Sequence, residues 1–326
     1  MQFSAGAHFI VRITADDVGR RVSVRTVTGR EEAGARFTDT VGVLTSWADG
    51  VLSVTRRDGR VVEIDEAAMV AAKVVPPVPA RRRGLPAADV AELTAVGVRA
   101  WPAPETERRG DWLARAAGGW TRRANSAVAP GGPGAGAPDL AWLGAWYAER
   151  HLPTVLHLGP GHEALAAELE GRGWSADGHA ALLVGALAPL ADRTPDERVV
   201  VTEELTDAWL AGWPRAAEAP AVARRVLAGG PRVFFGVVPG AAVGRCVVEG
   251  RWAGYAAVRV APAHRGTGLA TAVMGELARA ALGAGASAAY LQVATDNAPA
   301  RALYAALGFG EHHRYHYLTA PAPQGR

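Results

Sequence analysis

The chain has 326 residues, enough for two or three domains, and its 49% hydrophobic and 21% charged residues are ordinary for a globular protein in water. The 35 basic and 32 acidic residues nearly balance, and the excess equals the run Arg81–Arg83, so we expect no nucleic-acid surface. A membrane-spanning run and a signal-peptide pattern are absent, and one cysteine, Cys246, excludes a disulfide or a multi-cysteine metal site. We therefore expect a cytoplasmic protein that binds no membrane and no metal.

Residues 1–75 are predicted to form a small β-domain, an SH3-like barrel. The predicted strands are His8–Ile13, Arg21–Val27, Thr40–Trp47, Val51–Thr55 and Val61–Ile64. The turn signals between them are Thr28-Gly29, Ala48-Asp49-Gly50 and Arg57-Asp58-Gly59. Such barrels bind partners in some proteins and stabilise a neighbouring domain in others. No aromatic cluster marks a peptide groove here, which favours the second role.

A Pro/Arg-rich linker is predicted over residues 76–86, within and after the segment VVPPVPARRR. The triplet Arg81–Arg83 could contact an acidic partner or simply end a solvated linker. Three charges give weak, salt-sensitive binding, which favours the solvated linker.

Residues 87–195 predict alternating helices and strands around a glycine–proline loop, Pro130–Pro138. The helices are expected around Val90–Val96 and over Leu140–Arg150 and His162–Arg172. The strands are expected at Trp112–Arg115, Gly119–Val128, Thr154–Leu158 and Ala180–Leu187. The order strand, helix, Arg-Gly-Trp resembles the later order strand, helix, Leu-Gly-Phe at 307–309, so we interpret this region as a weak internal repeat.

Residues 196–320 predict an α+β domain with a mixed sheet. Its strands are expected at Val199–Val201, Val233–Val238, Val243–Val248, Tyr255–Val260 and Ala289–Val293, and its first helices at Asp207–Trp213 and Pro220–Ala228. The last strand is expected at Glu311–Tyr317, where period-2 alternation puts His313, Tyr315 and Tyr317 on one face.

A small-residue loop between a strand and a helix is the clearest motif. The loop follows Pro262, and the helix repeats apolar residues at Leu269, Val273 and Leu277. The junction consists of Arg265, Gly266, Thr267, Gly268, Leu269 and Ala270. Small residues let a ligand approach the backbone, and free N–H groups at a helix start attract anions, so this junction suits a pyrophosphate.

Taken with Asn297, Ala300, Tyr304 and Gly308-Phe309 downstream, the Arg265-x-x-Gly268-x-Ala270 loop resembles the Gcn5-related N-acetyltransferase (GNAT) superfamily. The resemblance covers residues 198–318, and with the preceding regions the chain resembles the tandem actinobacterial type that begins with an SH3-like barrel. It implies an acyl-CoA N-acyltransferase fold for residues 196–320, and a degenerate GNAT-like half for residues 87–195. That half lacks the glycine loop, so it should not hold CoA in the same way.

The resemblance also implies roles for single residues. Backbone groups of Arg265–Ala270 would bind the acetyl-CoA pyrophosphate, and those of Val258 and Val260 the pantetheine arm. Asn297 would hydrogen-bond that arm, although it could also simply cap a helix, and Ala300 and Tyr304 would also be part of the cofactor-binding site. Tyr304 would protonate the departing thiolate as general acid, although it could also be a core aromatic.

The general base and the acceptor are left open by the sequence. Glu249 is a candidate base beside the strand pair, and His264 and His313 are weaker candidates. Ordered water serves in many members of the superfamily. Trp252, Tyr255, Tyr315 and Tyr317 could line an acceptor site or belong to the core.

Two functions are therefore compared. The first is an acetyl-CoA-dependent N-acetyltransferase, in which a primary amine of a small molecule or protein attacks directly and forms a tetrahedral intermediate. The second is a non-catalytic acyl-CoA-binding module whose N-terminal barrel engages a protein or nucleic acid. The intact Tyr304 favours the enzyme. We expect a monomer or a weak homodimer, because a tandem chain satisfies internally the contacts that single-domain relatives make by dimerising.

Overall fold

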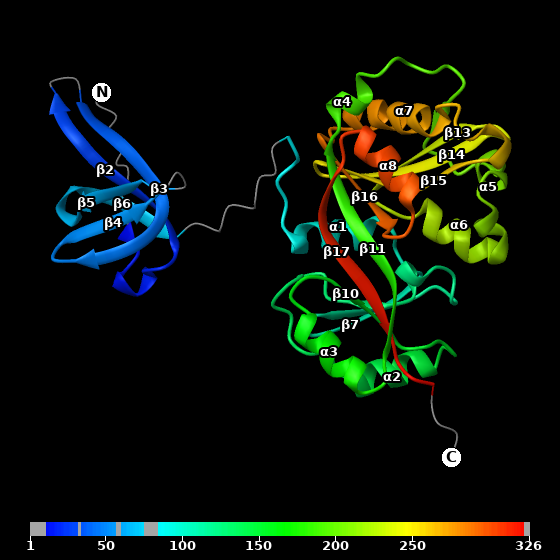
Figure 1. Ribbon diagram of the computed structural model, residues 1–326, viewed down its shortest axis with the longest axis horizontal. Helices are drawn as coiled ribbons and strands as arrows, with labels where there is room; N and C mark the ends of the chain where they lie inside the picture. Colours follow the sequence, from blue (N-terminus) through cyan, green and yellow to red (C-terminus); the bar gives the residue numbers. More distant parts are fainter. Residues whose placement is uncertain (1–10, 32–33, 57–59, 75–83, 323–326) are drawn as a thin grey trace, which may run out of the picture. The chain divides into compact units, whose positions relative to one another are not determined.

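The alternating apolar residues of the sequence form two separate sheets in the computed structural model, which describes residues 11–31, 34–56, 60–74 and 84–322. The chain divides into two units, Met1–Pro79 and Ala80–Arg326 (Figure 1). The triplet Arg81–Arg83 and most of the proline-rich segment lie outside the described residues.

The first unit is a six-stranded sheet in the order β1-β6-β2-β3-β4-β5. The strands are β1 (Val11–Arg12), β2 (Arg21–Glu31), β3 (Gly34–Ala48), β4 (Val51–Thr55), β5 (Val61–Asp65) and β6 (Met69–Val74). Its small core includes Val22, Val24, Leu44 and Leu52, all fully buried. The SH3-like barrel stays a prediction.

Two details of this unit differ from the predicted strands. Thr28-Gly29 is not a turn, because β2 continues to Glu31 and accommodates Gly29 with a shift in its register against β3. The sequence also missed β6, whose residues Met69–Val74 pair with both β1 and β2.

The second unit contains one sheet of eleven strands in the order β12-β13-β14-β15-β16-β11-β17-β10-β9-β8-β7. From the earlier part of the chain come β7 (Glu105–Arg109), β8 (Trp112–Ala116), β9 (Ala127–Val128), β10 (Val155–Leu158) and β11 (Ser175–Ala186). From the later part come β12 (Val200–Thr202), β13 (Arg232–Val238), β14 (Ala242–Glu249), β15 (Trp252–Val260), β16 (Ala288–Ala294) and β17 (Gly310–Thr319).

The strands that flank β11 and β17 are arranged in the same way on both sides of this pair, which lies side by side in Figure 1. On one side, β9 and β10 pair in parallel and β10 pairs antiparallel with β17. On the other side, β15 and β16 pair in parallel and β16 pairs antiparallel with β11. At the middle of the sheet, β11 from the earlier part of the chain therefore completes the half formed by β12–β16. Likewise β17, from the later part, completes the half formed by β7–β10.

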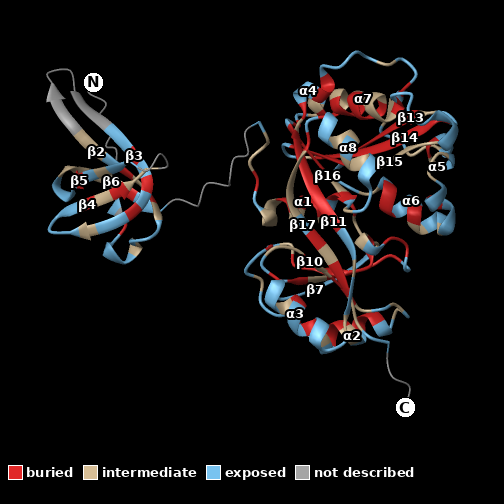
Figure 2. Ribbon diagram, viewed as in Figure 1, coloured by how far each residue is buried: buried red, intermediate tan, exposed pale blue. Residues whose placement is uncertain are grey.

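Helices cover both faces of the sheet, and buried residues are concentrated between them (Figure 2). The helices are α1 (Val90–Ala100), α2 (Leu140–Ala148), α3 (Glu163–Gly171), α4 (Ala188–Ala191), α5 (Asp207–Ala211), α6 (Pro220–Ala228), α7 (Leu269–Gly283) and α8 (Ala298–Ala306). Strand alternation sends Phe234 to the α7 face, and Val233 and Phe235 to the face with α1 and α6.

The predicted strand Gly119–Val128 is largely wrong. Only Ala127–Val128 is strand, and Arg122–Ala124 is a 3₁₀ turn. Strand β8 pairs with β9 on one edge and with β7 on the other, and the sequence did not predict β7. Thr121 has a φ of 61°, a left-handed conformation that a regular strand does not accommodate.

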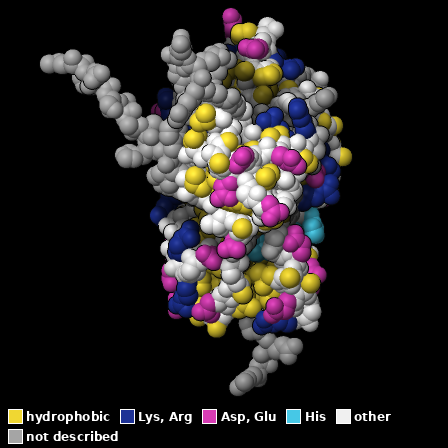
Figure 3. Space-filling model, turned by 90° about the vertical axis from the view of Figure 1, so that its left-hand side faces the viewer, with side chains coloured by type: hydrophobic (Ala, Val, Ile, Leu, Met, Phe, Trp, Pro, Cys, Tyr) yellow, Lys and Arg dark blue, Asp and Glu magenta, His cyan; other side chains and the backbone are white. Residues whose placement is uncertain are grey.

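Acidic and basic side chains lie among one another on the face shown in Figure 3. This mixture agrees with the near balance of charges in the sequence.

Candidate active site

The strands β15 and β16 separate partway along their length. They pair in parallel from Trp252 with Ala288 to Tyr255 with Leu291, and both strands then continue without further pairing to one another. The register of β15 against β14 shifts at the same place, where Ala257 takes a φ of 53°. The edge of residues 256–260 that turns away from β14 therefore offers backbone groups to an extended ligand.

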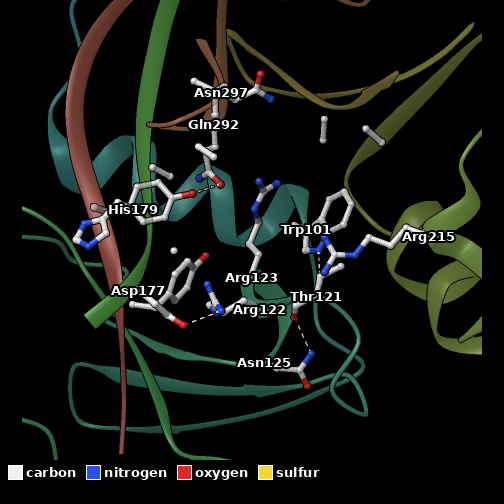
Figure 4. A pocket seen from close by; sticks show the side chains of 18 of the residues that line it. Trp101, Thr121, Arg122, Arg123, Asn125, Asp177, His179, Arg215, Gln292 and Asn297 are labelled. Atoms are coloured by element: carbon white, nitrogen blue, oxygen red, sulfur yellow. Dashed lines mark hydrogen bonds and ion pairs between the residues drawn. The ribbon is translucent and has the colours of Figure 1, made fainter. Parts of the chain in front are cut away.

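A cavity of about 960 Å³ opens where these strands separate (Figure 4). From the later half of the chain it is lined by Tyr255, Val258, Leu291, Gln292, Asn297, Ala300 and Tyr304, among others. From the earlier half come Trp101, Arg122, Arg123, Asp177 and His179, and β17 adds Tyr315 and Tyr317. The site is thus built from both halves of the sheet.

The small-residue loop forms an open cradle at the start of α7. Gly266 and Gly268 have φ of 75° and 80°, and a Cβ added to either would meet no atom within 4 Å. Gly268 is the N-cap of α7 and has no side chain to occupy the helix N–H groups. A second hollow, of about 580 Å³, is lined in part by Thr267 and Gly268. The loop can therefore receive a bound anion such as a pyrophosphate.

Asn297 is the N-cap of α8, and its Oδ1 accepts a hydrogen bond from the Ala300 N–H at 3.2 Å. Because the cap uses only Oδ1, the Nδ2 group of Asn297 stays available as a donor at the cavity. Tyr304, two turns along the same helix, also lines the cavity, and burial raises the pKa of its hydroxyl. The ring of Tyr304 packs edge-on against Phe309, with the ring centroids 6.1 Å apart.

Arg122 and Arg123 are site residues that the sequence did not single out. They stand in the turn before β9, which the buried Asn125 holds in place. Asn125 Oδ1 accepts from two backbone N–H groups at 2.8 and 2.9 Å, and its Nδ2 donates to two carbonyls at 2.8 and 2.7 Å. The amide thus replaces the ladder bonds of a strand, and it directs both arginines toward the cavity (Figure 4).

The remaining predicted residues lie elsewhere. Glu249 ends β14 and pairs with Arg99, and it is not among the residues that line the cavity. His264 is exposed beside the glycine loop. His313 points into the interior from β17, where burial lowers its pKa to about 4.

Tyr315 and Tyr317 share one face of β17 with His313, as the period-2 alternation predicts, and both largely buried tyrosines also line the cavity. The Tyr315 hydroxyl donates to Gln292 Oε1 at 3.0 Å. In the described ranges, no group of three or more His, Cys, Asp or Glu residues is placed to hold a metal ion. No helix of the described residues is long and apolar enough to cross a membrane.

Known proteins with similar sequences share this whole unit. A family model described as "Probable histone acetyltransferase Rv0428c C-terminal" matches residues 87–318. The "Probable histone acetyltransferase Rv0428c" of Mycobacterium tuberculosis is 31% identical over 310 residues, which cover 93% of this chain and 95% of the relative.

Solved structures show the same fold. A GCN5-related N-acetyltransferase from Kribbella flavida aligns with a TM-score of 0.52 at 17% identity, covering 71% of this chain and 95% of its own. A functionally unknown conserved protein from Staphylococcus epidermidis aligns with a TM-score of 0.51 at 10% identity, covering 68% and 94%. The α+β fold with a large mixed sheet is that of GNAT proteins, which confirms the resemblance seen in the sequence. The chain belongs to the Rv0428c family, whose model spans most of its second unit.

Proposed function

We propose that the protein is an acetyl-CoA-dependent N-acetyltransferase that acetylates a primary amine. The names of its relatives support an acetyltransferase in general. The observation that carries the finer proposal is the separation of β15 from β16 beside Asn297 and Tyr304, close along the chain to the glycine cradle. The cavity offers an open strand edge and a phenol, and the separate hollow at the start of α7 offers helix N–H groups free of side chains. These are the groups that a CoA thioester requires.

Each part of the cofactor has residues suited to hold it. Backbone N–H groups of Arg265–Ala270 would bind the pyrophosphate, and backbone groups of Val258 and Val260 would pair with the pantetheine amides. The Nδ2 group of Asn297 would donate to the same arm near Ala300. When bound, acetyl-CoA supplies an acyl group that is activated as a thioester.

Tyr304 would act as the general acid. As the amine nitrogen bonds to the acyl carbon and the carbon–sulfur bond breaks, the Tyr304 hydroxyl donates its proton to the sulfur. Burial raises the pKa of Tyr304, so the hydroxyl stays protonated at neutral pH and the proton is present when it is needed. We assign removal of the amine proton to water, because Glu249 pairs with Arg99 away from the cavity.

The earlier part of the second unit would be a degenerate repeat of the later part. The mirrored order of β9–β10–β17 and β15–β16–β11 supports this interpretation. The domain scheme we propose is therefore 1–75 for the N-terminal barrel, 76–86 for the linker, 87–195 for the degenerate half and 196–320 for the catalytic half.

The test is release of CoA thiol from acetyl-CoA against a panel of primary amines. The wild type should turn over, and Tyr304→Phe should lose about a hundredfold or more in kcat while it still binds CoA. Gly268→Glu should lose CoA binding, because the carboxylate would occupy the cradle.

Gly285→Glu is the matched control. Gly285 follows α7, has a φ of 93° and has open space around it, so this variant carries the same backbone strain and charge away from the cradle. Equal loss of CoA binding in both variants would contradict the cradle assignment. Tight CoA binding with no thiol release for any amine would favour the non-catalytic binding module instead.

A further inference from the structure

The cavity carries more positive than negative charge. Arg122, Arg123 and Arg215 line it together with one carboxylate, Asp177. Arg122 pairs with Asp177 at 2.8 Å, and Arg215 faces Glu218 at 3.8 Å. Arg123, by contrast, has no carboxylate partner in the part of the chain that the structure describes. Its side chain reaches into the middle of the cavity, toward Gln292 (Figure 4).

Arg123, which is half-buried, also lies near two fully buried guanidinium groups, those of Arg115 and Arg245. Arg115 is 2% exposed and bonds to the carbonyl and hydroxyl oxygens of Ser126, both at 2.9 Å. Arg245 is fully buried and bonds to three backbone carbonyl oxygens. Burial, and then repulsion from Arg123, lowers the pKa of Arg245 to about 9. Neutral oxygens thus accept the hydrogen bonds of Arg115 and Arg245 but leave the positive charge of these two groups, next to Arg123, uncompensated.

An aromatic ring compensates these positive charges only in part. The guanidinium carbons of Arg123 and Arg245 lie 5.1 and 5.2 Å from the centre of the Trp101 ring. A cation over an indole is stabilised by much less than an unpaired buried charge costs. An anion in the cavity is the partner that this arrangement lacks.

We propose that the acceptor of this enzyme is a primary amine that also carries a carboxylate, such as a free amino acid, and that Arg123 binds this carboxylate. The proposal rests on the proposed function and names its substrate class. A guanidinium binds a carboxylate through two parallel N–H···O bonds, which makes it selective for this group.

The charge of the cavity also argues against lysine-rich acceptors. A histone-like peptide would bring several positive charges to a site whose unpaired group is already a cation. We therefore expect free amino acids to be better acceptors than their amides, and lysine-rich peptides to be poorer than both.

The first measurement compares kcat/KM for free amino acids and for the matched amino-acid amides. Loss of one charged hydrogen-bonded pair predicts a preference of about tenfold or more for the acids in the wild type. Arg123→Gln should bring the ratio of acid to amide close to one. Arg224→Gln should keep the ratio, because Arg224 is exposed on α6, pairs with Asp207 and lies outside the cavity.

The second measurement is independent of turnover. Trp101 lies against Arg123, so binding can be followed by tryptophan fluorescence, with N-acetyl amino acids and their amides as product analogues. We expect the acids to bind at least about tenfold more tightly than the amides, and Arg123→Gln to abolish the difference. Equal affinity, or no binding of either series, would overturn the inference even if acetyl transfer occurs. The same preference without any transfer would support the carboxylate site and reject the proposed enzyme.

Discussion

Helices α3 and α8 follow equivalent strands in the two halves of the sheet, and they are built on the same backbone pattern. Each has nine residues and is followed by a glycine, Gly173 or Gly308, with a φ of 86°. In each, the second residue after the helix cap donates to a carbonyl in the last turns: Trp174 to Leu169, and Phe309 to Tyr304, both at 3.0 Å. Leu169 is fully buried, whereas the equivalent Tyr304 faces a cavity. One backbone frame therefore supports a core in one half and a site in the other.

The N-termini of the equivalent helices α2 and α7 show the same contrast, because one is filled by the protein's own side chain and the other is open. Asp139 caps α2, where its carboxylate accepts from the Trp142 N–H and pairs with Arg109, both at 2.9 Å. These bonds hold the pKa of Asp139 below its ordinary value. Gly268 stands at the equivalent place before α7 and leaves it open. The earlier half thus supplies its own anion, whereas the later half leaves room for the anion of a ligand.

The largest expected effect is a difference between Leu169, a core residue, and Tyr304, a residue of the candidate site. Leu169→Ala should lower the free energy of unfolding by about 2–5 kcal/mol, because it leaves a hole in a packed core. Tyr304→Leu, which copies the residue of the earlier half, should change stability by less than about 1 kcal/mol while it lowers acetyl transfer about a hundredfold. Urea denaturation and thiol release measure the two effects. Similar stability losses in both variants would remove the distinction between the helices.

A smaller effect is expected from moving the acidic cap. Gly268→Asp places a carboxylate where the pyrophosphate would bind, so the affinity for CoA should fall about tenfold at low salt. Added salt should restore part of the affinity, because it screens the repulsion. Gly268→Asn is the matched control, since Asn tolerates a positive φ and is uncharged. Titration calorimetry at two salt concentrations gives the result, and equal losses in the two variants would point to strain instead.

The smallest effect is expected at Glu249. Because it pairs with Arg99 and does not line the cavity, Glu249→Gln should change kcat/KM by less than about twofold at neutral pH. A pH–rate profile that loses its acid limb in this variant would instead identify Glu249 as the base.

The later half of the chain was largely predictable from its sequence. Helix α6 has the predicted bounds, and β13–β16 agree with the predicted strands to within a few residues, because alternation and helical spacing are local patterns. The loop Arg265–Ala270 was likewise visible, since glycine marks positions where the backbone must be open.

The side of the cavity that Arg122 and Arg123 line was not predictable in this way. The segment around Arg122 and Arg123 has a composition typical of a strand, and its real conformation depends on four hydrogen bonds of the Asn125 amide. The sequence also did not predict that β11 pairs with β16 of the later part and β17 with β10 of the earlier part, which we call the exchange of β11 and β17. Alternation fixes which face of a strand is buried but not which strand lies beside it.

This exchange has a consequence for synthesis of the protein on the ribosome. Strand β17, Gly310–Thr319, lies between β11 and β10 in the middle of the sheet, although it follows all the other strands in the chain. Until it leaves the exit tunnel, β11 and β10 expose edges that can pair with a strand of another nascent chain. We expect both halves to stay incomplete until then and to become stable in one late step, so that the cavity of the candidate site is completed only after β17 has left the tunnel.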